Sequence, residues 1–201
     1  NGMMADWMFQ AGAMPLNLVA DGSFEDKRLL EALDAGENQF LEADEQDVWK
    51  ASARVGSDCV SALEVQNIFT AAAESGGADG SQWVELDSVC VIGDFSRGNN
   101  VTVYQDVKLK AGHYYSFAFS YKKRVGGPAT QLQGLLAKIG GETVMEKVTT
   151  ESDWTRFEII KKVASDDIRI EFKETGTELT GRGTLLDAVE IMHIGDGALS
   201  N

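Results

Sequence analysis

The sequence predicts an all-β protein folded as one antiparallel β-sandwich of the jelly-roll type. Apolar and polar residues alternate with period two through much of the chain, and glycine-rich turns separate the alternating segments. A strand–helix–strand rhythm is missing, which argues against a parallel α/β sheet. The predicted organisation is an N-terminal extension at 1–15, the sandwich at 16–195 and a C-terminal tail at 196–201.

The expected strands begin at 16–19 and continue with short segments around 48–49 and 63–65. The alternation is clearest in the second half, where each segment places its apolar side chains on one face. These segments are 83–87, 101–104, 115–121, 154–159 and 168–172. The turn signals between strands are 76–80, 97–100, 126–128, 140–141 and 181–183.

Two stretches suggest short helical insertions in the sandwich. Residues 27–41 carry Leu29, Leu30 and Leu33 at helical spacing and reach a stop signal at Gly36. Residues 67–75 form a second candidate. Such insertions either shape a binding rim or cap the ends of the sandwich, and the sequence leaves both interpretations open.

Composition limits the partners of the chain. Its 201 residues include 18 Lys and Arg against 32 Asp and Glu, which gives a net charge of −14. This charge repels phosphate backbones and anionic lipids, so we expect neither nucleic acid nor membrane insertion, whereas cations are natural partners. The apolar runs are far shorter than the roughly 20 residues that span a bilayer.

The chain contains two cysteines, Cys59 and Cys90, and two histidines, His113 and His193. The cysteines are 90 − 59 = 31 positions apart, and a disulfide and two free thiols are equally compatible with that spacing. The histidines are expected to be turn or edge residues, and no zinc or haem site built from His and Cys is predicted.

A series of short motifs, taken in order, resembles the galactose-binding-like jelly rolls that include carbohydrate-binding modules. It is most similar to the peptide-binding domain of bacterial repeats-in-toxin (RTX) adhesins. The resemblance implies a calcium-dependent, extracellular module of a longer chain, monomeric by itself, that binds the C-terminus of a surface protein in cell adhesion or biofilm formation. The motifs are 17–25, 78–88, 103–107, 117–121, 152–154, 168–172 and 183–187.

The resemblance also implies that Glu25 and Asp187 hold a structural Ca²⁺. From the residues themselves, Asp187 follows two leucines that should be buried, so its carboxylate needs either a cation or backbone amides as partners. The alternative is that Asp187 caps amides while Glu25 is solvated. Further candidate metal ligands are Asp44, Asp47, Asp79 and Asp87.

Candidate ligand-binding residues follow from strand alternation. Trp83, Glu85 and Asp87 share one face, with Val84 and Leu86 on the other. Similarly, Phe117, Phe119 and Tyr121 should point inward and leave a shallow groove of small residues that ends in two cations suited to a carboxylate. Those cations are Lys122 and Arg124, and the side chains expected to add hydrogen bonds are Tyr104, Gln105, Gln131 and Gln133.

The sequence favours binding over catalysis, because it lacks a GxSxG elbow, an HExxH motif and a phosphate-binding loop. The first expectation is therefore a peptide-binding adhesin module. The alternatives are a carbohydrate-binding module that recognises a glycan and a structural spacer without a ligand.

Overall fold

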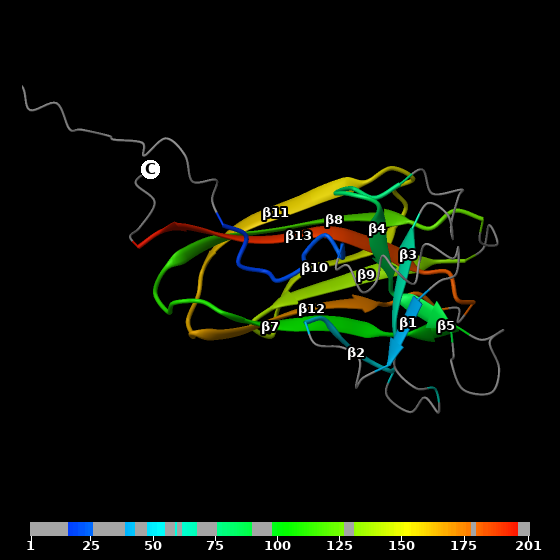
Figure 1. Cartoon of the computed structure of the whole chain (residues 1–201), viewed down its shortest axis with the longest axis horizontal. Helices are drawn as coiled ribbons and strands as arrows, with labels where there is room; N and C mark the ends of the chain where they lie inside the picture. Colours follow the sequence, from blue (N-terminus) through cyan, green and yellow to red (C-terminus); the bar gives the residue numbers. More distant parts are fainter. Residues whose placement is uncertain are drawn as a thin grey trace, which may run out of the picture.

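Every regular element that the computed structural model describes is a β-strand, in agreement with the predicted all-β fold (Figure 1). The structure describes residues 16–25, 39–42, 48–54, 59, 62–67, 76–89, 98–126, 131–177 and 180–196. Within them no helix is long and apolar enough to cross a membrane.

Two antiparallel sheets form the sandwich (Figure 1). The first sheet has six strands in the order β1-β3-β4-β13-β8-β11, and the second has five in the order β10-β9-β12-β7-β2, while β5 and β6 form a separate pair. The strands of the first sheet are β1 (Gln39–Glu42), β3 (Ala62–Asn67), β4 (Gln82–Glu85), β13 (Thr184–Gly195), β8 (Tyr114–Lys123) and β11 (Thr155–Lys162). Those of the second are β10 (Glu142–Thr149), β9 (Gln133–Ile139), β12 (Asp167–Glu174), β7 (Thr102–Lys108) and β2 (Lys50–Ser52), and the pair is β5 (Asp87–Val89) with β6 (Gly98–Asn100).

The core lies between the sheets and is built from the predicted apolar faces. Phe117, Phe119 and Tyr121 of β8 point inward, and the rings of Phe119 and Phe172 meet edge to face with centroids 4.9 Å apart. Val84 and Leu86 are fully buried in the same core. Because successive side chains alternate, the neighbours of these residues point away from the second sheet.

Some expectations differ from the structure. Residues 16–19 do not form a regular strand, because the side chain of Asn17 takes part in the ladder: its Oδ1 accepts from Ile191 N at 2.9 Å and its Nδ2 donates to Val189 O at 2.9 Å. Of the two expected helices, 27–38 and 68–75 lie outside the described residues. Residues 39–41 belong to β1 and Asn67 ends β3, so these positions are extended and not helical.

Candidate binding face

The candidate site is the face of the first sheet that points away from the second sheet. Ser116, Ala118 and Ser120 of β8 lie on it, opposite to the buried phenylalanines. This outward face has two parts that differ in exposure. The closed half covers β3 and β4, and the open half covers β8, β11 and the end of β13.

A buried ion pair organises the closed half. Arg124 Nη1 donates to Glu85 Oε2, although the Glu85 side chain is 0% exposed and that of Arg124 is 16% exposed. Gln66 lies between two acids, since its Nε2 donates to Glu64 Oε1 at 2.8 Å and also to Glu85. Burial, and then repulsion by Glu64, raise the pKa of Glu85 well above its usual range against the opposing effect of Arg124.

Trp83 completes this network, and its place in the network explains why Trp83 does not face solvent. Its Nε1 donates to Gln66 Oε1 at 3.1 Å, and the side chain is fully buried. Trp83 also packs edge to face against Trp154, with ring centroids 6.4 Å apart. Trp83 and Glu85, two of the predicted ligand-binding residues, are thus brought together here as buried partners.

Three buried carboxylates hold the loop that precedes β13. Asp87 Oδ2 accepts from the backbone amides of 180, 181 and 182 at 3.0, 3.0 and 3.2 Å. Glu85 Oε1 accepts from Gly183 N at 2.8 Å, and Glu174 Oε2 accepts from Thr184 N at 2.6 Å. Every amide from 180 to 184 therefore donates to a carboxylate. Burial raises the pKa of Asp87 to about 6 and also raises that of Glu174.

A second loop, 78–82, is held by the two acids for which calcium was expected. Asp187 Oδ2 accepts from Ala78 N at 2.6 Å and Asp79 N at 3.0 Å. Glu25 Oε1 accepts from Ser81 N at 2.5 Å and Gln82 N at 2.6 Å. Asp187 thus caps amides, as in the alternative interpretation, whereas Glu25 is not merely solvated because it caps amides too.

The chemistry around this loop fits a hard cation in two respects. Asp187 is fully buried, and burial raises its pKa to about 7, so its ionised form lacks charge compensation. Among the residues that the structure describes, the side-chain oxygen Oε1 of Gln82 is buried without a hydrogen-bond partner, while Nε2 of the same amide donates to Glu25 Oε2 at 3.3 Å. Carboxylate and amide oxygens are the ligands that Ca²⁺ prefers, although here the amides of the loop compete for the same lone pairs.

The open half also contains an arginine paired with a glutamate, but this pair lies at the surface. Arg156 Nη2 on β11 donates to Glu190 Oε2 on β13 at 2.6 Å, with side chains 41% and 31% exposed. The guanidinium crosses β8 over small residues, since Arg156 is opposite Ser120 and Glu190 is opposite Ala118. Ser116 Oγ donates to Glu158 Oε1 at 2.6 Å. The small residues of the predicted groove, Ser116, Ala118 and Ser120, are buried, and the groove itself stays a prediction.

Trp154 lies at the boundary between the two halves. Its Nε1 donates to Gly76 O at 2.8 Å, and its side chain is only partly buried. The Lys122 ammonium lies over its ring, 5.0 Å from the centroid. The two cations predicted to end the groove are therefore both engaged within the protein, Lys122 with Trp154 and Arg124 with Glu85.

The predicted glutamines bind backbone. Gln105 accepts from Ala20 N at 2.9 Å and donates to Ala20 O at 3.0 Å. Gln133 forms the equivalent pair with Arg124, at 2.8 and 3.0 Å. Gln131 is buried and its Nε2 donates to Arg182 O at 2.5 Å. We assign these amides to loop and strand positioning.

The other predicted residues lie apart from the outward face of the first sheet. Tyr104 is on β7 of the second sheet, where the Arg169 guanidinium stacks 4.2 Å from its ring centroid. Asp79 is exposed in the 78–82 loop, whereas Asp87 is buried beneath the 180–184 loop. Asp44 and Asp47 lie outside the described residues.

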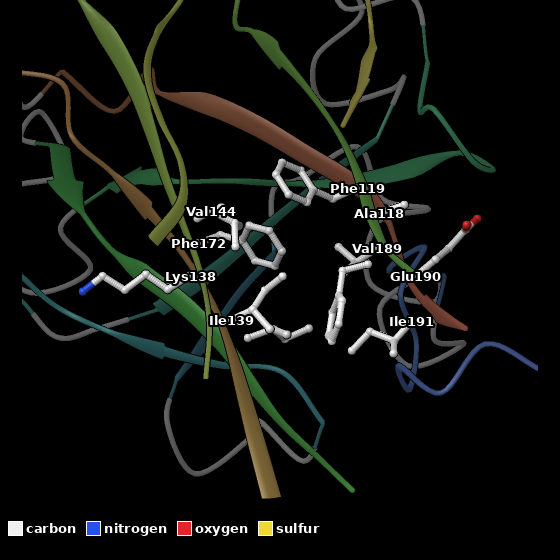
Figure 2. Close-up of a pocket in the computed structure, with 12 residues that line it drawn as sticks. Ala118, Phe119, Lys138, Ile139, Val144, Phe172, Val189, Glu190 and Ile191 are labelled. Atoms are coloured by element: carbon white, nitrogen blue, oxygen red, sulfur yellow. The ribbon is translucent and has the colours of Figure 1, made fainter. Parts of the chain in front are cut away.

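A small cavity between the sheets is part of the core. Its free volume is ≈ 10 Å³, on the scale of one water molecule, and apolar side chains from both sheets line it. In Figure 2 Phe119, Phe172 and Ile139 lie around it, whereas the charged ends of Lys138 and Glu190 point away on opposite sides. This cavity is too small and too apolar to hold a sugar or a peptide.

Sequence reasoning missed the residues that make the open half. Arg156 and Glu158 alternate with the inward-pointing Phe157, so the period-two pattern of β11 places them on the outward face. Their pairing with Glu190 depends on strand order, which places β8 between β11 and β13. Strand order is not visible in a single sequence.

No protein-family model matches the chain, and no curated protein sequence matches it. Several solved structures do match the chain. TmCBM61 in complex with β-1,4-galactotriose has a TM-score of 0.55 and 19% sequence identity, over 89% of this chain and 99% of that one. The enzymatically active domain of bacteriophage CBA120 tailspike protein 4 has a TM-score of 0.55 and 16% identity. That match covers 89% of this chain but 21% of the tailspike chain.

At these identities the likeness establishes the fold. The antiparallel sandwich agrees with the predicted jelly roll, and TmCBM61 shares this fold. The association with RTX adhesins stays a prediction. The chain has the jelly-roll sandwich of a carbohydrate-binding module.

Proposed function

We propose that this chain is a non-catalytic carbohydrate-binding module and that the open half of the outward face binds the glycan. The observation that carries the proposal is the Arg156–Glu190 bridge across small residues, with the partly exposed Trp154 beside it. The likeness to a module that binds β-1,4-galactotriose supports it.

The residue types suit a sugar. Each sugar hydroxyl both donates and accepts hydrogen bonds, and Glu158, Arg156 and Glu190 offer charged acceptors and donors within one exposed cluster. The Lys122 ammonium lies over the Trp154 ring, and the exposed remainder of the indole is an apolar surface on which a sugar ring can pack. Ser116 and Ala118 are small and are themselves buried, so a flat ligand would contact the charged side chains that cross them.

A glycan fits better than a peptide C-terminus, the first expectation from the sequence. A terminal carboxylate requires an available cation, but Arg124 already pairs with Glu85 and Lys122 lies over Trp154. Arg156 remains as a cation at the surface, and the two neighbouring acids, Glu158 and Glu190, repel an anionic ligand. The test of glycan binding therefore has to distinguish it from peptide binding.

The experiment is a screen of neutral oligosaccharides, β-1,4-galactotriose included, and of peptides with free or amidated C-termini. Arg156→Ala should weaken glycan binding about 10–100-fold, since a charge-assisted hydrogen bond contributes about 1.5–3 kcal/mol. Arg169→Ala is the matched control, because Arg169 is 45% exposed and paired with Asp106 on the second sheet.

Four results contradict the proposal. Binding only to peptides with a free C-terminus favours the adhesin reading, and no binding at all favours a spacer. Weaker glycan binding in Arg169→Ala but not in Arg156→Ala would place the site on the surface around Tyr104. Release of reducing sugar ends from a bound glycan contradicts the non-catalytic assignment.

We also propose that Ca²⁺ binds between Glu25 and Asp187 and fixes the 78–82 loop. The buried charge of Asp187 and the partnerless Oε1 of Gln82 support this assignment. Calcium should raise the melting temperature of the native chain, and Asp187→Asn should reduce that increase. An equal increase in Asp187→Asn and in the exposed control Asp153→Asn would contradict the site.

The proposed location is extracellular. Cys59 is disulfide-bonded, and Cys90 is the only other cysteine of the chain. Disulfides form and persist in oxidising compartments, which supports export. Fractionation of the producing cells tests this location, and finding the protein with Cys59 reduced inside the cytoplasm would contradict it.

A further inference from the structure

The only two histidines of the sequence meet at one end of the sandwich. His113 lies in the turn before β8 and His193 lies near the end of β13, which are adjacent strands (Figure 1). His113 Nδ1 is 3.0 Å from His193 Nε2, and the ring centroids are 5.2 Å apart. The two residues are 80 positions apart, so no sequence pattern predicts that they meet.

A carboxylate completes the cluster. Asp196 Oδ1 is 2.7 Å from His113 Nδ1 and 3.0 Å from His193 Nε2. The three atoms thus form a nearly equilateral triangle with edges of 2.7, 3.0 and 3.0 Å. A proton in a hydrogen bond lies between two atoms, so one proton joins only two corners of the triangle. A metal ion above the triangle can bind all three atoms at once.

We propose that His113, His193 and Asp196 bind a divalent first-row transition-metal ion such as Zn²⁺. Ligands that are cis on an octahedral ion at about 2.1 Å lie about 3 Å apart, which matches the observed edges. Tetrahedral ligands would lie about 3.4 Å apart, so the triangle fits one face of an octahedron with the remaining positions open to water. Imidazole nitrogens select transition metals over Ca²⁺, which prefers oxygen.

The surroundings position both rings. Gly112 N donates to Val163 O at 2.8 Å and Val163 N donates to His113 O at 3.1 Å, so the turn that carries His113 is anchored. The ring of Tyr115 packs 5.3 Å from that of His193, and its hydroxyl accepts from Lys110 N at 2.8 Å. Metal access is open, since the side chains of His193 and Asp196 are 46% and 71% exposed.

A bound ion would clip the end of the last strand to the turn that begins β8. The site is separate from the glycan and calcium proposals, because none of their residues is shared with it. Its test therefore succeeds or fails independently of both.

The experiment is calorimetric titration of ZnCl₂ into tag-free, EDTA-treated and desalted protein, with Co²⁺ absorption as a second measurement. We expect one Zn²⁺ per chain, and His113→Gln, His193→Gln and Asp196→Asn should each weaken binding more than the 10–100-fold typical of outer-shell changes. Asp167→Asn, another exposed acid that is paired with Lys108, should bind Zn²⁺ as the native chain does. Asp187→Asn should also leave Zn²⁺ affinity unchanged, and excess Ca²⁺ should not compete.

Two results overturn the proposal. One is the absence of Zn²⁺ binding to the native chain at about millimolar metal, the weak limit of useful affinity. The other is unchanged affinity and an unchanged Co²⁺ spectrum in His113→Gln/His193→Gln. Asp196→Asn alters an exposed side chain and should fold, so it keeps the test informative if a histidine variant does not.

Discussion

Two arginine–glutamate ion pairs on the outward face of the first sheet lie in different environments. In the closed half Arg124 pairs with Glu85, with side chains 16% and 0% exposed. In the open half Arg156 pairs with Glu190, with side chains 41% and 31% exposed. Arg124, which follows β8, pairs with Glu85 of β4, and Arg156 of β11 pairs with Glu190 of β13, so the two pairs have the same chemistry and differ in burial.

The difference indicates what each pair does. A buried charge is costly to leave unpaired, and Glu85 also holds the amide of Gly183, so the closed pair belongs to the architecture of the loop before β13. An exposed pair contributes about 0–1 kcal/mol to folding and can exchange its partner for a ligand. We therefore assign stability to the closed half and recognition to the open half.

The largest expected effect is on folding. Arg124→Ala should destabilise the chain by about 3–5 kcal/mol, because it leaves the buried carboxylate of Glu85 without its cation. Arg156→Ala, the matched variant, should cost less than about 1 kcal/mol. Urea unfolding of both proteins measures these values.

The double variant Arg124→Ala/Glu85→Gln removes the orphaned charge and should recover part of the loss. Equal destabilisation by Arg124→Ala and Arg156→Ala would eliminate the proposed division between the two halves.

A smaller effect concerns pH and Asp87 beneath the 180–184 loop. Its pKa is raised from 3.8 to about 6, so the folded state holds the proton more tightly than the unfolded chain. The stability contributed by protonation is fully present below about pH 4 and is lost as the pH rises through about 6. The loss is up to about 3 kcal/mol, at 1.36 kcal/mol for each pKa unit.

Asp87→Asn should remove this loss, because the amide keeps an acceptor oxygen for the loop but does not ionise. The difference in unfolding free energy between Asp87→Asn and the native chain should therefore move in favour of the variant from pH 4 to pH 7. If the unfolding free energies of the two proteins changed in parallel with pH, ionisation of the buried Asp87 would not destabilise the fold.

The smallest expected effect is at the floor of the open half. Ser116→Ala removes the 2.6 Å hydrogen bond to Glu158, which should cost about 1 kcal/mol or less in stability. Because Glu158 then loses its orientation, glycan affinity should fall a few-fold by titration. Ser120→Ala changes a neighbouring floor residue opposite Arg156 and should affect affinity less. The reverse order would indicate that Glu158 is not a ligand contact.

The fold could be predicted because it depends on local alternation. The patterns around Phe117, Phe172 and Val84 identify the core faces directly, and all three residues are buried as expected. The segment 16–19 failed because Asn17 hydrogen-bonds through its side chain, which alternation does not reveal. Glu25 and Asp187, expected to share a calcium ion, both hold the 78–82 loop, and the calcium itself stays a prediction.

The candidate site was less predictable because it depends on which strands are neighbours. Trp83 and Glu85 were chosen for their residue types, but contacts with Gln66 and Arg124 commit them to the interior. Arg156 and Glu190 are 34 positions apart, and only the order β11-β8-β13 makes them partners. The histidine pair was missed for the same reason.

The central claim is that the open half recognises the glycan, and amide and indole chemical-shift mapping tests it most directly. Isotope-labelled protein is titrated with the best oligosaccharide from the screen. The account predicts that the largest shifts fall on the indole N–H of Trp154 and on the amides of 116–120, 156–158 and 190–192, while the amides around Tyr104 and Arg169 stay in place. Shifts concentrated around Tyr104 and Arg169, with Trp154 unmoved, would contradict it.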